Sequence, residues 1–595
     1  MKSAFRMACL WVVALALAAC SSTPPSRPSG EDGKVATRGL PATPIGQLIN
    51  PIQTTPTVWV FPAIRGTVLG PTVVKIDWVG LAGNYAYDVY RGTNLVGSVS
   101  GNGTALSVND QNVTPGGSYA YSVAARPVAT VSTTPVPGQA TLTANTNLVT
   151  SSTITVTVPD FVRPAGLTAT QNAQGGFAVQ LSWPSAASYQ PAYVVRRNGI
   201  DVATVTSTAF ADALPGPGWY TYDVSSVAPG PNGQVLRSAP TGPVTVHAGP
   251  FHALAFGDSI MWGQGLAERA KFVNLVSSWV QGQLGLSVVT TNLAHSGATV
   301  VPPSHLAPPL LGVTPATFDP MEAKQGGIPN RFGEAPNSFP TISYQALTMG
   351  PSLGDPRLVD LILVDGCAND VGMINVLDPG VPASQMALTA QADCFSPLQQ
   401  LLWGIHTTYP NARIILTGYY KAISSQSNIA ATQDYTKTLG IDQAGIAAAL
   451  QLVHTVAATA GWSISDLLAD REYQFYNAAT GSMMQAVSTL PATPKFADFA
   501  DPLLSDANAY GAPQTHLWPV PTSPRNADDV FAQRQQLCAS LPPSDPTFDP
   551  STCPYASMGH PNEAGAQQYA TAIEGRLQQF VPGWAKAFAP TQSWP

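Results

Sequence analysis

The sequence predicts a multidomain protein in which two β-sandwiches precede an α/β domain built on a parallel sheet. Three observations lead to this prediction. The length of 595 residues exceeds that of one domain, short alternating strands fill the first part of the chain, and strands alternate with helical segments after Pro250. Charged residues make up 10% of the chain, against about 25% in an average soluble domain. With 51 glycines and 55 prolines, this composition is typical of an exported chain rich in strands and loops.

Residues 1–19 have the pattern of a signal peptide. Lys2 and Arg6 supply its positive charges, and an apolar stretch follows them. The stretch ends in Leu-Ala-Ala-Cys20 and is followed by two serines, which resembles the lipobox of bacterial lipoproteins. The resemblance implies cleavage before Cys20, acylation of that cysteine, and attachment to a bacterial membrane, most simply at the outer membrane or cell surface. An ordinary secretory signal with a chance cysteine is the alternative.

Residues 20–56 are rich in serine, threonine, proline and glycine and contain few large apolar side chains. A segment of this composition cannot bury a core, so we expect a disordered tether. The formal net charge of the whole chain is -7, which provides no basic surface for nucleic acid. We therefore expect no nucleic-acid partner.

Residues 57–160 and 161–248 form two blocks of short runs rich in valine, threonine and tyrosine. Trp78 ends a strand in the first block, and Trp183 ends the corresponding strand in the second. The repeat predicts two copies of one β-sandwich, with both tryptophans in the core rather than on a ligand-binding surface. The tryptophan, together with a Tyr-x-Tyr pattern late in each block, resembles fibronectin type III modules.

Residues 250–595 alternate apolar runs with segments of helical period. The predicted strands are Leu254–Phe256, Val288–Leu293, Leu358–Val364 and Ile414–Tyr419. The predicted helices are Glu268–Leu284, Met386–Tyr409, Ala444–Ala460 and Asn562–Phe580. This alternation predicts a three-layer α/β domain, with functional groups at the carboxyl ends of parallel strands. Two insertions, at about 302–357 and 475–550, are expected to wall a substrate site.

Candidate catalytic residues follow the predicted strands. Gly257-Asp258-Ser259 comes directly after the first strand, where a serine at a strand–helix turn can act as a nucleophile. Gly297 and Asn369 follow the next two strands and could donate hydrogen bonds to an oxyanion. His560, which opens the last predicted helix, is the natural general base for Ser259. The alternative for Gly-Asp-Ser alone is an ordinary turn.

These stretches resemble, in order, the four sequence blocks of the SGNH (GDSL-type) hydrolases: Gly257-Asp258-Ser259, Gly297, Asn369-Asp370, and His560-Pro561-Asn562. The resemblance implies hydrolysis of carboxylic esters through an acyl-enzyme on Ser259, with His560 as base. It also implies an oxyanion hole formed by the amides of Ser259 and Gly297 and the side chain of Asn369. We expect no cofactor and no metal, because the remaining histidines lack the spacing of metal ligands.

The chain departs from this family pattern at two positions. Cys367 stands where the third block usually has glycine, and Ser557 stands three residues before the histidine, where the family usually has aspartate. Another carboxylate could orient His560, and Asp545 and Asp549 are near it in sequence. Alternatively, a Ser–His dyad works with a carbonyl or hydroxyl group on the far imidazole nitrogen. We favour the dyad and keep Ser557, Asp549 and Asp545 as candidates for a third member.

Four cysteines remain once the signal and the lipid-bearing cysteine are set aside. An even number in an oxidising compartment predicts two disulfides, and four cysteines allow three pairings. We expect the nearest-neighbour pairs, Cys367–Cys394 and Cys538–Cys553; free buried thiols are the alternative. A bridge at Cys367 would brace the loop that carries Asn369.

The motifs do not identify the natural substrate, because lipases, simple esterases, phospholipases and carbohydrate deacetylases share them. The expected partner is an ester of an acyl lipid, a small alcohol or a polysaccharide. A carbohydrate O-deacetylase, or an O-acyltransferase in which a sugar hydroxyl replaces water, is the second hypothesis. A non-catalytic adhesin with a decayed hydrolase domain is the third. The oligomeric state does not follow from the sequence.

Overall fold

The computed structural model describes residues 61–128, 148–171, 175–185, 192–230, 234–302, 333–334, 340–455, 461–491, 495–521, 527–540 and 553–579. The predicted signal peptide, Cys20 and the tether lie outside these residues. The chain forms two compact units, and the described parts of the first are 61–65, 76–108, 121–128 and 148–154. The second unit comprises 66–75, 109–120 and the described residues from 155 onward.

The first sandwich block forms two sheets. One has the strand order β1-β2-β5, and the other has the order β4-β3-β6-β7, with β8 also paired to β6. The strands are β1 (Arg65–Gly70), β2 (Val73–Val79), β3 (Tyr85–Arg91), β4 (Asn94–Gly101), β5 (Ala105–Asp110), β6 (Ser118–Pro127), β7 (Val149–Thr150) and β8 (Ile154–Thr157). Trp78 is 2% exposed and packs on Tyr87 with ring centroids 5.7 Å apart, so its predicted place in the core is confirmed.

The second sandwich block repeats this pairing. Its sheets have the orders β13-β10-β9 and β12-β11-β14-β15, with β16 paired to β14. The strands are β9 (Thr168–Gln171), β10 (Ala178–Ser182), β11 (Ala192–Arg197), β12 (Ile200–Val205), β13 (Ala209–Ala213), β14 (Gly218–Pro229), β15 (Val235–Arg237) and β16 (Val244–Ala248). Neighbouring strands are antiparallel. Trp183 is buried against Tyr193 at a ring distance of 5.4 Å, as its counterpart is in the first block.

The α/β domain contains a five-stranded sheet of order β18-β17-β19-β20-β21, and neighbouring strands are parallel. The strands are β17 (Phe251–Phe256), β18 (Val288–Asn292), β19 (Val359–Val364), β20 (Arg413–Thr417) and β21 (Ala497–Ala500). Every residue of β19 and β20 is buried, because helices cover both faces of the sheet. The predicted fold class, antiparallel sheets followed by a parallel α/β domain, is confirmed.

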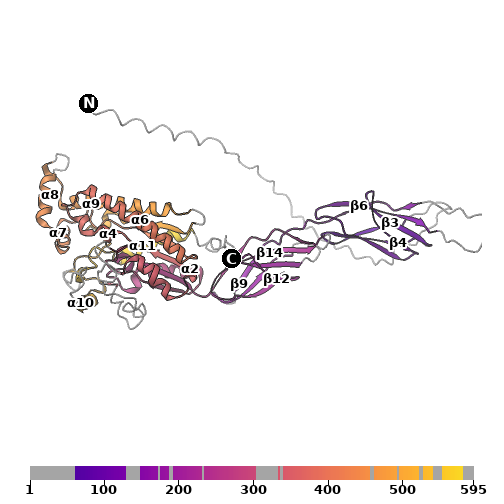
Figure 1. The fold of residues 1–595 in the computed structure, drawn as a ribbon, viewed down its shortest axis with the longest axis horizontal. Helices are drawn as coiled ribbons and strands as arrows, with labels where there is room; N and C mark the ends of the chain where they lie inside the picture. The colour runs from indigo at the N-terminus through magenta and orange to yellow at the C-terminus, as the bar shows by residue number, and fades with distance from the viewer. Residues whose placement is uncertain are drawn as a thin grey trace, which may run out of the picture. The chain divides into compact units, whose positions relative to one another are not determined.

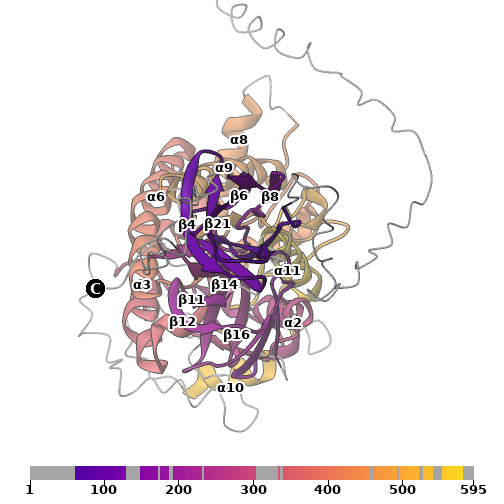
Figure 2. The same ribbon diagram turned by 90° about the vertical axis from the view of Figure 1, so that its right-hand side faces the viewer.

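Helices form the outer layers of this domain. Figures 1 and 2 show α6 and α9 over one face of the sheet and α2 and α11 over the other. The α-helices are α1 (Ser259–Trp262), α2 (Phe272–Leu284), α3 (Ile342–Tyr344), α4 (Ala368–Val371), α5 (Met373–Leu377), α6 (Ala383–Thr408), α7 (Ile429–Thr438), α8 (Gln443–Thr455), α9 (Ile464–Ser488), α10 (Phe531–Ser540) and α11 (Glu563–Leu577). None of the described helices has the length and hydrophobicity needed to span a membrane.

The predicted second insertion begins too early. Residues 475–488 continue the long helix α9, which starts at a capping box formed by Ser463 and Asp466. Strand β21 also lies inside the predicted insertion, because it has only four residues, too few to give a clear pattern. The structure further shows helix α7, which the sequence analysis did not predict. In the first insertion, residues 342–358 form short helical turns.

Asp360 at the start of β19 connects the second sandwich to the α/β domain. Its Oδ1 atom accepts a hydrogen bond of 2.8 Å from Trp219 Nε1 in β14, and Oδ2 accepts one of 2.8 Å from the amide of His252 in β17. His247 in β16 lies beside both groups: its Nε2 is 3.5 Å from Asp360 Oδ1, and its ring is 4.7 Å from that of Trp219. This junction lies at the amino ends of the parallel strands, opposite the edge that carries the predicted catalytic residues.

Candidate active site

Ser259 lies at the first position of α1, directly after β17 and a two-residue turn. Asp258 caps this helix, because its Oδ1 accepts a hydrogen bond of 2.8 Å from the amide of Ile260. Gly257 has no room for a side chain, since an added Cβ would lie 2.0 Å from Asp365 Oδ1. Gln345, from the first predicted insertion, bonds both the amide and the carbonyl of Gly257 at 2.8 and 3.0 Å. Asp258 and Gln345 therefore both hold the turn that carries Ser259.

Two buried carboxyl groups lie behind this turn. Asp365 Oδ1 accepts a hydrogen bond of 2.8 Å from the amide of Asp258, and Tyr419 donates one of 2.7 Å to Asp258 Oδ2. Burial raises the pKa of both carboxyls, and the charge of Asp258 further raises the pKa of Asp365. The pair supports the backbone that presents Ser259.

His560 lies against Ser259, although 301 residues separate them in sequence. Its Nε2 is 2.7 Å from Ser259 Oγ, and its Nδ1 is 3.3 Å from the carbonyl oxygen of Met558. A proton on Nδ1 that points to this carbonyl leaves Nε2 free to accept the serine proton. Tyr420 holds the turn that precedes His560, because its hydroxyl donates a 2.7 Å hydrogen bond to the carbonyl of Gly559.

The three predicted oxyanion donors follow three neighbouring strands, β18, β17 and β19. As the first residue of α1, Ser259 has an amide without an intrahelical acceptor. Gly297 has a φ of +78°, a conformation that glycine adopts without strain. Asn369 in α4 donates from Nδ2 to the carbonyl of Ala298 at 3.0 Å, and its amide group has a second N–H to offer.

Backbone contacts hold these three loops together. The amide of His295 donates to the carbonyl of Gly257 at 3.0 Å, which joins the second block to the first. The amide of Val300 donates to both oxygens of Asp370 at 3.1 and 3.0 Å, which joins the second block to the third. The predicted site residues therefore belong to one connected edge of the sheet.

Of the three candidates for a third catalytic residue, Ser557 is described by the structure, and its side chain does not bond His560 but other groups. Ser557 Oγ donates a 2.5 Å hydrogen bond to Asp528 Oδ2 and accepts one of 2.9 Å from Arg534 Nη2. Its side chain thus points to an ion pair, while the far imidazole nitrogen of His560 faces a backbone carbonyl. Asp545 and Asp549 lie outside the described residues. No residue type marks the Met558 carbonyl in the sequence, because any residue provides that group.

Burial lowers the pKa of His560 to about 4. The positive charge of Arg534 lowers the pKa further. The hydrogen bond with the Met558 carbonyl and the negative charge of Asp528 raise it. The imidazole is therefore neutral at pH 7, the state that a general base needs. Among the described residues, no three His, Cys, Asp or Glu side chains are arranged to hold a metal ion.

This pKa predicts activity that persists into acid. A general base at His560 acts only in its unprotonated form, so the expected result is a kcat/KM on esters that falls only as the pH drops through the folded-state pKa of about 4. The measurement is kcat/KM against pH on an uncharged ester, with circular dichroism to confirm that the fold survives at each pH. An acid midpoint near the ordinary histidine value of about 6.5 would contradict the prediction.

Both disulfides have the predicted pairing. Cys367 and Cys394 join the N-terminus of α4 to α6, with Cα atoms 5.1 Å apart, and Cys538 and Cys553 join α10 to the turn before His560, with Cα atoms 5.8 Å apart. Cys367 has a φ of +97°, which is unusual for a residue with a side chain. The glycine that the SGNH pattern has here would adopt this conformation without strain.

The positive φ of Cys367 leads to a prediction about how the Cys367–Cys394 bridge affects stability. Removing it by Cys367→Ala with Cys394→Ala should lower the free energy of unfolding by about 2–4 kcal/mol. The pair Cys367→Gly with Cys394→Ala should recover about 1 kcal/mol of that loss, because glycine relieves the strain at positive φ. Urea denaturation measures both differences. Equal stability of the two double variants would show that the loop relaxes once the bridge is gone.

No protein-family model matches the chain, and no curated protein matches its sequence. Among solved structures, the extracellular lipase of Streptomyces rimosus is 13% identical with a TM-score of 0.30, over 55% of this chain and 99% of that chain. A family two carbohydrate esterase from Clostridium thermocellum, in complex with cellohexaose, is 9% identical with a TM-score of 0.26, over 86% and 93%. The fibronectin(III)-like modules of Clostridium thermocellum CbhA are 13% identical with a TM-score of 0.16, over 31% and 93%.

Proposed function

We propose that this chain is a serine ester hydrolase of the SGNH type, with Ser259 as nucleophile and His560 as general base. The observation that carries the proposal is the 2.7 Å contact between Ser259 Oγ and His560 Nε2, at the carboxyl edge of the parallel sheet. A hydroxyl and a neutral imidazole at this distance allow direct proton transfer. The proposed class of substrate is a carboxylic ester.

In the proposed reaction, Ser259 Oγ attacks the ester carbonyl carbon while its proton moves to His560 Nε2. The amides of Ser259 and Gly297 and the side chain of Asn369 bind the oxyanion that forms. The imidazolium then gives its proton to the leaving alcohol oxygen, and an acyl-enzyme remains. His560 Nε2 then takes a proton from water as the water oxygen attacks the acyl carbon. The imidazolium returns this proton to Ser259 Oγ as the bond between Oγ and the acyl carbon breaks, which releases the acid and free Ser259.

The Met558 carbonyl takes the place of a triad carboxylate in this scheme. A carbonyl oxygen 3.3 Å from Nδ1 can fix the tautomer and orient the ring. It carries no full charge, so it stabilises the imidazolium less than an aspartate does. We therefore propose a Ser–His dyad supported by backbone, as the sequence analysis favoured.

The proposed place of action is outside the cytoplasm. Two disulfides favour an oxidising compartment. Anchoring through Cys20 stays part of the proposal. Mass spectrometry of the protein purified from membranes would show a diacylglycerol or triacyl modification on Cys20, and an unmodified N-terminus after residue 19 would contradict the anchor.

The test of the function is covalent labelling and turnover of the folded protein. A fluorophosphonate should label Ser259, which peptide mass spectrometry identifies, and p-nitrophenyl esters should be hydrolysed in buffer with a chain-length profile. Folded protein that neither labels nor hydrolyses any ester would overturn the proposal. Labelling with slow release of p-nitrophenol, accelerated by added sugars that become acylated, would identify an O-acyltransferase instead.

A further inference from the structure

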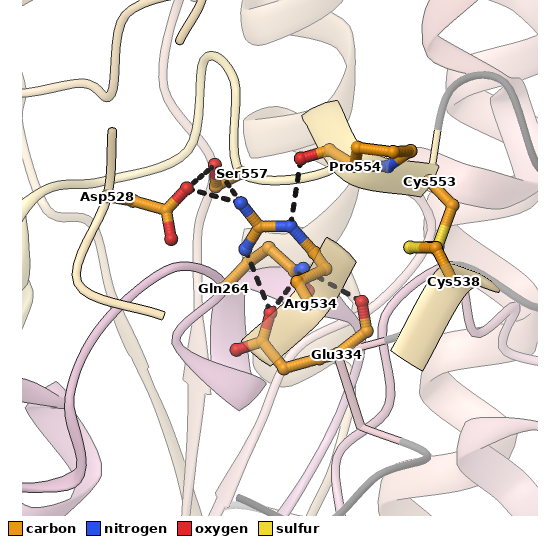
Figure 3. The surroundings of a disulfide bond; sticks show 8 residues. All are labelled: Gln264, Glu334, Asp528, Arg534, Cys538, Cys553, Pro554 and Ser557. Carbon is orange, nitrogen blue, oxygen red and sulfur yellow. Dashed lines mark hydrogen bonds and ion pairs between the residues drawn. A yellow bond between two sulfur atoms is a disulfide. The ribbon is translucent and has the colours of Figure 1, made fainter. Parts of the chain in front are cut away.

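A buried ion cluster lies next to the histidine turn. We call it the Arg534 cluster; it consists of Arg534, Asp528, Glu334 and Ser557. The side chain of Arg534 is 0% exposed, and those of Asp528 and Glu334 are 1% and 4% exposed. Figure 3 shows the guanidinium between the two carboxylates, with the Cys538–Cys553 disulfide nearby.

Each nitrogen of the guanidinium has its own partner. Nη2 donates to Asp528 Oδ2 and, at 2.9 Å, to Ser557 Oγ. Nη1 donates to Glu334 Oε2 at 3.2 Å, and Nε donates to the carbonyl of Pro554 at 3.1 Å. A planar fork is required for this pattern, and the single nitrogen of lysine cannot reproduce it.

On one side, the cluster reaches the helix that carries the nucleophile. Glu334 Oε1 accepts a 3.0 Å hydrogen bond from Trp262 Nε1 at the end of α1. Glu334 Oε2 accepts one of 2.6 Å from Gln264 Nε2, just beyond that helix. Through Glu334, the guanidinium is therefore connected to the segment that begins at Ser259.

On the other side, the cluster holds the turn that carries the base. Two of its contacts, Ser557 Oγ and the Pro554 carbonyl, lie on this turn. The amide of His560 donates to the carbonyl of Ser557 at 2.9 Å, and Met558 supplies the carbonyl that faces Nδ1. Arg534 is thus bonded to the backbone segment that determines where the imidazole lies.

Stability alone is a poor explanation for this arrangement. Removing three charged groups from water carries a large desolvation cost, and apolar side chains of similar volume often stabilise a core better. A buried ion cluster does, however, define the relative position of the segments that it joins. Here these segments carry the two groups whose contact the proposed reaction requires.

We propose that Arg534 is a positioning residue, which fixes the His560 turn against the Ser259 helix and so maintains the contact between Oγ and Nε2. Together with Asp528 and Ser557 it performs, through the backbone, the orienting task that a triad aspartate performs directly. This inference rests on the proposed function. It explains why the position three residues before the histidine is Ser557: its hydroxyl ties the turn to the ion pair.

The test compares Arg534→Lys with a matched variant, Arg471→Lys. Arg471 is also buried, and its guanidinium donates to the carbonyls of Val376, Val381 and Asn375, away from the histidine turn. Both variants should lower the melting temperature. Only Arg534→Lys should slow the fluorophosphonate labelling of Ser259, by about 10- to 100-fold, with a similar loss in kcat and a change in KM below about threefold.

Wild-type rates in Arg534→Lys, or equal slowing in both folded variants, would overturn the inference while the proposed function stands. Absence of labelling in the wild type would overturn the function and the inference together. Failure of the inference and failure of the proposed function can therefore be told apart, because the wild type is measured in the same assay.

A second pair of variants decides the question if Arg534→Lys does not fold. Ser557→Asp restores the family's aspartate, but it places a second carboxylate beside Asp528 in a buried site. We expect it to slow labelling at least about 10-fold, and we expect Ser557→Asp with Asp528→Asn to recover to within about threefold of the wild type. Faster labelling by Ser557→Asp alone would mean that His560 needs only a direct carboxylate, and would overturn the role of the cluster.

Discussion

Replacing Ser259 with alanine is expected to reduce kcat for p-nitrophenyl ester hydrolysis by about 10⁴- to 10⁶-fold, because loss of the nucleophile removes the acyl-enzyme route. The expectation depends on the 2.7 Å contact between Ser259 Oγ and His560 Nε2. The variant should fold as the wild type does, since hydrogen bonds to backbone groups hold the turn around Ser259. Stopped-flow and long-time assays measure the residual rate, and fluorophosphonate labelling should disappear.

Ser278→Ala is the matched control. Ser278 is an exposed serine of α2 whose hydroxyl bonds the carbonyl of Asn274, so its loss should leave kcat unchanged within error. If Ser259→Ala retained more than about 1% of wild-type kcat, the measured hydrolysis would come from another nucleophile or a contaminant. In that case the proposed role of Ser259 would be wrong.

Replacing Asn369 with alanine is expected to reduce kcat by about 10²- to 10³-fold with little change in KM. One N–H of its amide bonds the Ala298 carbonyl at 3.0 Å, and the proposed role of the other is to donate to the oxyanion. That second bond matters most in the transition state, where negative charge develops on the substrate oxygen. Steady-state kinetics on p-nitrophenyl acetate separates kcat from KM.

Asn375→Ala is the control for this prediction. Asn375 lies in α5, just beyond α4, and donates from Nδ2 to the carbonyl of Val371 at 3.0 Å, so it matches Asn369 in its side-chain contact but not in its proposed role. It should change kcat by less than about threefold. Equal losses in both variants, with equal losses of stability, would assign Asn369 to the packing of its loop.

The parallel sheet was largely predictable from sequence, because buried strands are short apolar runs that end at glycine or polar residues. Leu358–Val364 and the observed β19 (Val359–Val364) differ by one residue for this reason. The four-residue β21 is too short to show a pattern, and the buried face of α9 is interrupted by the polar residues Arg471, Glu472 and Ser482. They form because the finished domain provides the surfaces on which they pack.

The candidate site likewise contains residues that the sequence predicts and residues that it does not. Ser259, Gly297, Asn369 and His560 were predictable because each follows a strand or opens a helix within a recognisable motif. The Arg534 cluster was not, because Glu334, Asp528 and Arg534 come from separate segments and meet only through tertiary folding. The acceptor of the far imidazole nitrogen is not predictable for a simpler reason: the Met558 carbonyl is a backbone group, which no residue type marks.

Ser259 and His560 are separated by 301 residues in the sequence, and this separation has a consequence for biosynthesis. The ribosome makes the nucleophile early and the base late, and β21, the last strand of the sheet at Ala497–Ala500, is complete before His560 is translated. A prematurely terminated chain that contains every described strand therefore still lacks the proposed base. The proposed dyad is therefore complete only after the segment that opens α11 has been added.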